Sequence, residues 1–200
     1  MADAAAIEGG FADLVLEGQR VFRATMDALA NPGTIQPLGA LAQPPAPLTP
    51  ELAALALTVL DHDSPVWLDP VLAAAPVVAD WLRFHTGAPI VTDLAEAMFA
   101  LVADAAASPL LEAFAMGTDE YPDRSTTLII AADSLTGGPS LTLRGPGIER
   151  TKAFAPNVQL ANFHAQWADN RAKFPRGVDV IFVADGHVAG LPRTTRIGEE

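Results

Sequence analysis

The sequence contains no cysteine, and only two of its 200 residues are lysine. Without cysteine the chain cannot form disulfides, hold iron–sulfur clusters or use a thiol as a nucleophile. Lys152 and Lys173 stand in no motif of a Schiff-base residue, and a solvated surface lysine is the usual case. Basic residues are scarce overall, twelve against twenty-four acidic ones. The resulting formal charge of -12 repels a phosphate backbone, so we expect no direct binding of nucleic acid.

Targeting signals and long apolar runs are missing as well. The first residues, MADAAAIEGGFADLVLEG, have no cationic start and no clean apolar core, and no stretch approaches the roughly 18 apolar residues of a membrane span. We therefore expect a cytoplasmic protein without a membrane association. Half of the residues are apolar, which is enough for a sizeable core. We expect a single domain over residues 1–200, with a flexible N-terminus at residues 1–10.

The spacing of apolar residues predicts three helices in the first half of the chain. The first ends at Asn31-Pro32-Gly33, and the second begins at Thr49-Pro50, a capping side chain followed by proline at the first helical position. The third ends near His85, because Gly87 suits a left-handed residue after a helix. The expected apolar stripes are Phe11, Leu14, Val15, Phe22, Met26 and Leu29, then Leu52, Leu55, Ala56, Val59 and Leu60, then Val77, Val78, Trp81 and Leu82.

The second half of the chain has the pattern of a sheet. Residues 66–68 are a short strand candidate, and residues 126–132 and 140–144 predict strands on either side of a glycine-containing turn, where we expect the sheet to begin. Asn157 is a candidate cap for a helix marked by Leu160, Phe163, Trp167, Arg171 and Phe174. In VDVIFVADGHVAGL, Asp185-Gly186 is typical of a two-residue hairpin turn that places Val183 opposite Val188. The prediction is an α/β fold, a mixed sheet with an antiparallel C-terminal hairpin, covered by helices.

Glycines in this half also give an expectation about stability. The turn at Asp185-Gly186 needs positive φ at both central residues, and a β-branched residue is most strained there. From the sequence we therefore expect Gly186→Val to destabilise the fold more than Gly138→Ala. Gly137, Gly138, Gly145 and Gly147 indicate turns and not a phosphate loop, because no Gly-Lys-Ser/Thr follows.

No catalytic or metal motif stands in the sequence. Asp61-His62-Asp63 has the composition of a metal cluster, but three consecutive side chains diverge, so capping and loop hydrogen bonds are the better interpretation. The four histidines show no ligand spacing, and no serine lies in a Gly-x-Ser-x-Gly setting. We assign no catalytic residue, no metal ligand and no cofactor.

The candidates for a binding site are cationic. Arg193 and Thr194 belong to GLPRTTRIG, where guanidinium and hydroxyl donors suit a phosphate or carboxylate, although surface arginines more often pair with acids. Arg83 and His85 are two residues apart near a helix end. His85 continues an apolar stripe into the final turn, so it is either a packing residue or a partner of Arg193 around an anion.

The order of several short motifs resembles a known family, the H subunit of the bacterial carbon–phosphorus lyase system. The resemblance runs from Phe22 onward through FRATMDALANPG, DHDSPVWL, RFHTGAP, SLTGG, LRGPGI, FPRGVDVIFV and LPRTT. Single pieces are weak, but the ordered set is specific. Residues 1–20 and the proline-rich residues 40–50 match least.

The resemblance implies a subunit of a phosphonate-degrading core complex, with the G, I and J subunits as partners. That complex transfers a phosphonate onto the ribose of a nucleoside triphosphate and displaces adenine, so this chain would be a structural and assembly subunit. It would form a homodimer when isolated. The implied fold is a reduced large domain of pyridoxal-phosphate transferases without the cofactor. The alternative is an independent enzyme or binding protein for a phosphorylated or carboxylated ligand.

Overall fold

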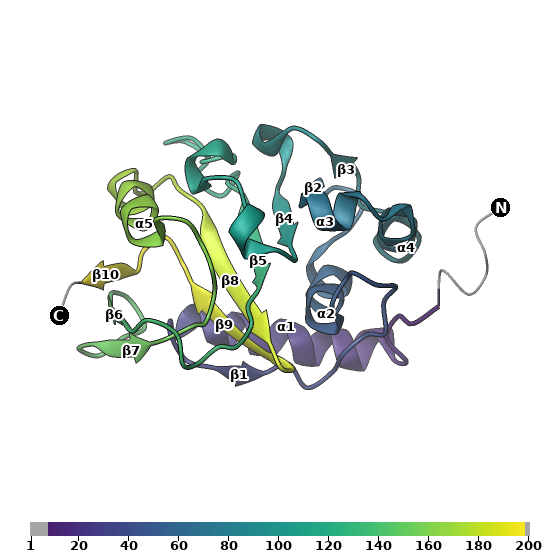
Figure 1. The fold of residues 1–200 in the computed structure, drawn as a ribbon, viewed down its shortest axis with the longest axis horizontal. Helices are drawn as coiled ribbons and strands as arrows, with labels where there is room; N and C mark the ends of the chain where they lie inside the picture. Colours follow the sequence, from purple (N-terminus) through teal and green to yellow (C-terminus); the bar gives the residue numbers. More distant parts are fainter. Residues whose placement is uncertain (1–7, 199–200) are drawn as a thin grey trace.

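The computed structural model describes residues 8–198 and has a seven-stranded mixed sheet at its centre (Figure 1). Its strands are β1 (Gln36–Pro37), β2 (Val66–Leu68), β3 (Ile90–Val91), β4 (Phe99–Val102), β5 (Thr127–Ala131), β8 (Asp179–Ala184) and β9 (His187–Leu191). They follow the order β1-β9-β8-β5-β4-β2-β3. The strands from β8 to β3 run parallel. At one edge β9 pairs antiparallel with β8, and β1 pairs antiparallel with β9. Parallel strands are buried on both faces, which explains their continuous apolar sequences.

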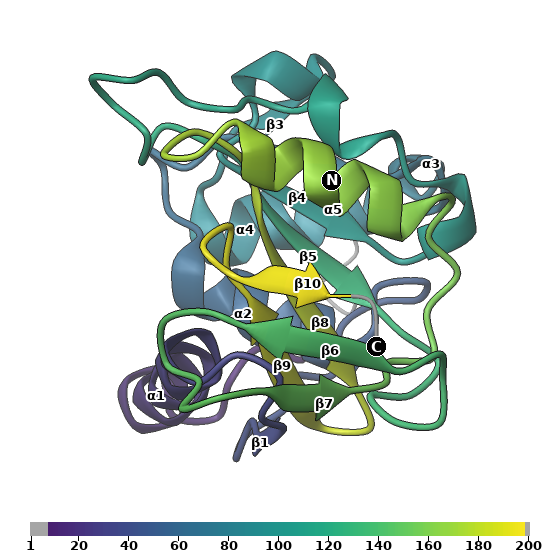
Figure 2. The same cartoon turned by 90° about the vertical axis from the view of Figure 1, so that its left-hand side faces the viewer.

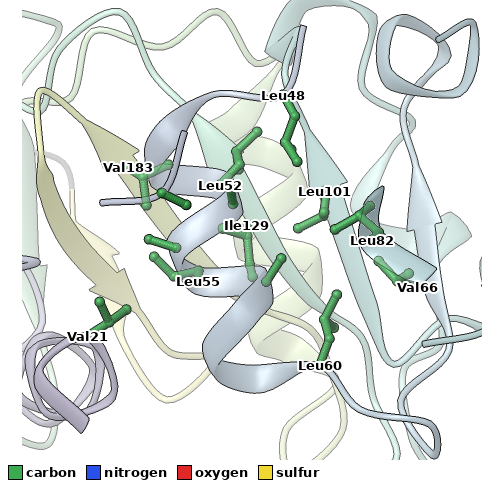
Figure 3. Close-up of a cluster of buried hydrophobic side chains, with 14 of the residues drawn as sticks. Val21, Leu48, Leu52, Leu55, Leu60, Val66, Leu82, Leu101, Ile129 and Val183 are labelled. Atoms are coloured by element: carbon green, nitrogen blue, oxygen red, sulfur yellow. The ribbon is translucent and has the colours of Figure 1, made fainter. Parts of the chain in front are cut away.

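Within residues 8–198, four α-helices cover one face of this sheet. They are α1 (Leu14–Ala30), α2 (Pro50–Val59), α3 (Pro70–Ala73) and α4 (Pro76–Thr86). Figure 3 shows Leu52 and Leu55 of α2 against strand residues such as Ile129 and Val183. Each fully buried leucine of this kind stabilises the fold by about 1.5–3 kcal/mol relative to an exposed one. The apolar α2 is therefore the centre of this half of the core.

The opposite face carries α5 (Phe163–Ala172) and a second, antiparallel sheet. The second sheet has the order β10-β6-β7, and its strands are β6 (Leu141–Arg144), β7 (Lys152–Phe154) and β10 (Arg196–Gly198). Figure 2 shows it beside α5, with β10 nearest the helix. Three 3-10 helices, η2 (Leu94–Glu96), η3 (Ala105–Ala107) and η4 (Leu111–Ala113), connect strands in the described chain. Trp167 packs here against strand residues such as Leu128 and Phe182.

The predicted α/β class and the C-terminal hairpin are confirmed. Val183 lies opposite Val188, and the two turn residues have φ of 50° at Asp185 and 73° at Gly186. Both angles are positive, as a tight turn matching the twist of the strands requires. The Gly186 N–H also donates to Glu51 Oε1 at 2.9 Å, which ties the hairpin tip to the start of α2.

The predicted helix boundaries are confirmed at three places. Thr49 caps α2, its hydroxyl accepting from the Leu52 N–H at 3.3 Å, and Asn31 ends α1. Gly87 follows α4 with φ 72°, the left-handed conformation expected after a helix. These signals are local, because each depends on the side chain or backbone of one residue at a helix end.

Most of the apolar stripe predicted for the first helix does not face the core, although Phe11 is buried just before the helix and Leu29 packs against the core. Leu14, Val15 and Phe22 are 65%, 64% and 50% exposed, whereas the buried residues of α1 are Val21, Thr25 and Ala28. Polar Thr25 can be buried because its hydroxyl donates to the Val21 carbonyl at 2.8 Å. The side of α1 that packs on the sheet carries small residues because α1 approaches β9 closely. A Cβ added at Gly190 would lie 2.9 Å from backbone atoms of Ala28.

Two other expectations for the second half are wrong. The sheet begins with β1 and β2, well before residue 126. The two strands predicted on either side of the glycine-containing turn are confirmed as β5 and β6, but they belong to different sheets. Asn157 does not cap the helix. It forms a bridge with Ser134, and the N-cap position of α5 is Asn162, whose φ is 50°. Strand pairing depends on residues far apart in the chain, and the sequences of the short strands β3, β4, β7 and β10 do not indicate their partners.

The N-terminal residues expected to be flexible fall into two parts. Residues 1–7 lie outside the described chain, but residues 8–10 contact the body. The Glu8 carbonyl accepts from Trp81 Nε1 at 2.8 Å, and the Gly9 carbonyl accepts from the Gln43 N–H at 2.7 Å. Among residues 8–198, no helix combines the length and the apolar character needed to cross a membrane.

The structure reverses the expected ranking of two glycine substitutions. A Cβ at Gly138 would lie 2.1 Å from the Pro156 carbonyl oxygen, whereas a Cβ at Gly186 would meet only Leu41 Cδ1, at 3.8 Å. Gly138→Ala should therefore lower the free energy of unfolding by about 3 kcal/mol, because the backbone must move. Gly186→Val should lower it by about 1–2 kcal/mol through φ strain alone.

Urea unfolding of the two variants measures this difference. Gly137→Ala is the matched control, since Gly137 neighbours Gly138, has φ 82° and would place its Cβ in open space. We expect its loss to be about 1 kcal/mol. A Gly138→Ala protein as stable as the control would mean that the chain does not approach Pro156 closely at this turn.

Candidate functional site

Arg83 and His85, two of the predicted anion ligands, lie in the last turn of α4. The exposed Arg83 faces Asp80 one turn earlier, with 3.7 Å between Nη1 and Oδ1. The His85 ring packs 4.4 Å from the Trp81 ring and 5.0 Å edge-on from the Phe84 ring, measured between centroids. A Cβ at Gly10 would lie 2.7 Å from His85 Cε1. These contacts support the packing interpretation of His85.

Arg193, the third candidate, holds three segments together. Its guanidinium contacts both carboxylate oxygens of Asp179 at the start of β8, and Nε lies 3.1 and 3.2 Å from them. The backbone N–H of Arg193 also donates to Asp179 Oδ1, at 2.7 Å. Nη1 donates to the Pro122 carbonyl at 2.6 Å. Thr194, the fourth candidate, follows in the chain, and its carbonyl faces Gly145. The donors of Arg193 are therefore largely used inside the protein.

The structure does not bring the four candidates together. Arg83 and His85 are on α4, while Arg193 and Thr194 precede Thr195, whose carbonyl accepts from Trp167 of α5 at 2.9 Å. Figure 1 shows α4 and α5 at opposite ends of the molecule. A joint site of His85 and Arg193 has no geometric support, and anion binding by either pair alone stays a prediction.

Asp61-His62-Asp63 has the geometry of a loop. Asp61 Oδ1 accepts from the Ser64 hydroxyl at 2.6 Å and from the Asp63 N–H at 3.0 Å. The hydrogen bond from Ser64, followed by that from Asp63, lowers the pKa of Asp61 below its usual range. Within residues 8–198, no group of three His, Asp or Glu side chains is placed to hold a metal ion. Whether the protein binds a metal or a cofactor stays a matter of prediction.

Asp69, which no pattern in the sequence marks as a site residue, occupies the topological switch point of the sheet. The connection from β2 to β3 contains α4 and lies on one face of the sheet, whereas the connection from β4 to β5 lies on the other face. The two connections therefore diverge between the neighbouring strands β2 and β4. In open α/β sheets, ligands bind outside the carboxyl ends of the strands at such a point. Here the residue directly after β2 is Asp69, which is 0% exposed. Its only signal in the sequence is Asp-Pro after an apolar strand, the pattern of a helix cap.

The Asp69 carboxylate takes the backbone donors that a ligand would use. Oδ2 accepts from the N–H groups of Ala103 and Asp104, both at 2.8 Å, directly after β4. Oδ1 accepts from the Leu72 N–H at 2.9 Å and caps α3. Adjacent backbone N–H groups at a strand end commonly cradle anions. In this chain that position is filled by its own side chain.

A shallow cavity of about 200 Å³ remains beside this edge, between the ends of β4 and β5. Its lining is small and acidic, with Asp104 and Asp133 as the charged residues. Two carboxylates and no basic residue disfavour phosphate-bearing substrates by charge repulsion. The charge at this edge of the sheet therefore disfavours the binding of a nucleotide.

Several large apolar side chains are exposed on the outer side of α1. A groove of about 550 Å³ runs along it between α1 and the end of α2. We call the set Leu14, Val15, Phe22, Met26 and Leu57, which lines this groove, the α1 surface. Patches of this kind on otherwise polar proteins mark sites of association.

Comparisons with known proteins agree with these observations. The model of the family described as bacterial phosphonate metabolism protein (PhnH) matches residues 9–198. The chain is 47% identical over 192 residues to the alpha-D-ribose 1-methylphosphonate 5-triphosphate synthase subunit PhnH of Rhizobium meliloti (strain 1021), covering 96% of each chain. It is 33% identical over 184 residues to the putative C-P lyase subunit protein HtxG of Stutzerimonas stutzeri, covering 90% of this chain and 85% of that one. The chain thus belongs to the PhnH family of bacterial phosphonate metabolism proteins.

Proposed function

We propose that the chain is an assembly subunit of the enzyme complex that attaches a phosphonate to the ribose of a nucleoside triphosphate and releases adenine. Its similarity to a synthase subunit and to a C-P lyase subunit supports this role in phosphonate metabolism. The proposed partners are the G, I and J subunits of the complex, and the proposed location is the cytoplasm. In this role the chain supports the reaction without carrying it out alone.

The observation that carries the proposal is the combination of a filled switch point with an exposed α1 surface. The Asp69 carboxylate accepts the hydrogen bonds of the backbone N–H groups at the carboxyl edge of the sheet, so these donors are not available to a phosphate-bearing substrate. The α1 surface, by contrast, leaves apolar side chains such as Phe22 in solvent, where burial against another protein is favourable. The arrangement favours binding of protein over binding of substrate.

For the isolated chain we propose a homodimer through the α1 surface. A two-fold axis requires the same patch on both copies. Pairing α1 antiparallel with its second copy, with the two-fold axis between Arg20 and Val21, places Val15 of one helix opposite Met26 of the other. Phe22 then meets the region of Gly18 and Gln19, where a helical glycine leaves room for the ring: a Cβ at Gly18 would meet nothing within 4 Å.

The proposed relation to a reduced large domain of pyridoxal-phosphate transferases fits the positions of the lysines. Lys152 is exposed on β7 of the second sheet, and Lys173 follows the end of α5. Neither lies at the carboxyl edge of the parallel strands, where α/β sheets bind ligands. This supports a fold that shares the architecture without a Schiff-base residue.

Adenine release tests the proposed function directly. The purified chain, mixed with methylphosphonate and a nucleoside triphosphate, should produce no more free adenine than buffer, as measured by chromatography. A mixture of the G, I and J subunits should release adenine substantially faster when the chain is added. Adenine release by the chain alone would identify an independent enzyme, and an equal rate without the chain would remove its role in the complex.

A further inference from the structure

A groove of about 440 Å³ lies between α5 and β10, on the side of the molecule away from the α1 surface. Figure 2 shows α5 directly beside β10, and the hydrogen bond from Trp167 Nε1 to the Thr195 carbonyl joins the two. The groove has the volume of a small-molecule site.

The sequence of α5 explains the shape of this groove. His164, Ala168 and Arg171 are spaced four and three residues apart, so they share one side of the helix. The methyl group of Ala168 leaves a hollow between the two larger, basic side chains. Trp167 and Ile197 line the same hollow with apolar atoms. The result is an apolar depression with basic groups around it.

Every ionisable residue that lines the groove is basic: His164 and Arg171 from α5, and Arg196 from β10. This is notable in a chain with twice as many acidic as basic residues. Arg196 also lies directly opposite Arg144 in the sheet register. Like charges at directly opposed positions destabilise a sheet. The placement therefore needs an explanation other than stability of the isolated chain.

The charge of these residues is not neutralised within the described part of the chain. Arg144, Arg196 and His164 make no ion pair among residues 8–198, and Arg171 Nε is buried without a hydrogen-bond acceptor there. Arg171 instead stacks on Phe174, with 4.7 Å between its guanidinium carbon and the ring centroid. Other arginines form ion pairs with acidic side chains: Arg193 with Asp179, and Arg176 with Asp119.

We propose that this groove is a binding site for a small organic molecule that carries a phosphoryl group. Two guanidinium groups and an imidazole offer more donors than the two oxygens of a carboxylate can accept, while a phosphoryl group has three free oxygens. The apolar floor suits an organic body attached to that group. This proposal goes beyond the assembly role, because it gives the chain a ligand of its own.

Isothermal titration calorimetry with phenyl phosphate tests the proposal, since this probe joins a phosphoryl group to an apolar ring. The wild-type chain should bind it with at least about tenfold higher affinity than Arg196→Gln, which removes one charged donor from the groove. Arg20→Gln is the matched control, because it removes the same charge from an exposed position on α1 and should bind like the wild type. Both arginines are exposed, and melting temperatures check that both variants are folded.

The same titrations contain the results that would overturn the proposal. Unchanged affinity in Arg196→Gln, or no heat with the wild type up to about 10 mM phenyl phosphate, would mean that the groove binds no phosphoryl group; 10 mM is already weaker than most specific sites. Loss of binding in Arg20→Gln alone would move the site to α1. Benzoate that binds as tightly as phenyl phosphate would remove the assignment to a phosphoryl group.

Discussion

Replacing Asp69 by asparagine should lower the free energy of unfolding by about 3 kcal/mol, the largest loss of stability that we expect from a single isosteric change. The carboxylate accepts three backbone N–H groups, two of them on Oδ2. An amide has one acceptor oxygen, so its NH₂ group must face at least one buried donor. In a chain of this length the melting temperature should fall by roughly 6–12 °C.

Asp93→Asn is the matched control for this experiment. Asp93 makes a comparable bond, from the Ala95 N–H to Oδ1 at 2.9 Å, but it is exposed at the start of η2. Asparagine caps a helix about as well as aspartate, so the loss should stay within about 0.5 kcal/mol. Equal stability of Asp69→Asn and the control would show that the donors after β4 are not held by Asp69.

Phe22→Glu should convert the isolated chain from a dimer to a monomer at micromolar concentration. The substitution places a carboxylate at the centre of the α1 surface, where dimer formation would have to bury it without a partner. We expect the dissociation constant to rise at least about 100-fold, equivalent to nearly 3 kcal/mol. Folding should be unaffected because Phe22 is already 50% exposed. Light scattering and sedimentation measure the change.

Phe84→Glu provides the comparison, since it changes an exposed phenylalanine on α4 in the same way. Phe84 is 61% exposed and does not line the groove of the α1 surface. The protein should remain a dimer. A monomer in this variant together with a dimer in Phe22→Glu would place the interface on α4, and a wild-type monomer would end the homodimer proposal.

Local features of this fold could be predicted from the sequence because single residues determine them. Thr49 and Gly87 mark helix ends through a cap and a positive φ, and Asp185-Gly186 specifies a turn that fixes the register of two strands. The α/β class followed from the intermixed helical and strand patterns. Each of these signals lies within a few neighbouring residues.

Features that depend on contacts between distant segments could not be predicted. The helical period of α1 is clear, but the side that meets the sheet is decided by Gly190, which lets the backbone approach at Ala28. Apolar residues then remain outside. Gly138 is similar, because its constraint is the Pro156 carbonyl eighteen positions later.

The positions of the candidate site residues relative to one another could not be predicted for the same reason. Arg83, His85 and Arg193 were grouped by residue type, and chain proximity says little about which end of a sheet a side chain reaches. Asp69 was missed because its partners lie 34 and 35 positions away. Hydrogen bonds between residues so far apart in the chain can be recognised only once the arrangement of the strands is known.

The close seating of α1 on β9 has a kinetic consequence. With no Cβ at Gly190, the backbone of α1 at Ala28 and Leu29 lies against the strand at a distance that any side chain there would prevent. The α1 surface is therefore presented in one orientation before any partner arrives. Association then needs no rearrangement of the backbone, so encounter should proceed as the docking of two rigid bodies. The association rate constant should then be limited by diffusion and orientation, in the range of about 10⁵–10⁷ M⁻¹s⁻¹. The side chains that become buried in the interface should determine the dissociation rate, and with it the lifetime of the complex.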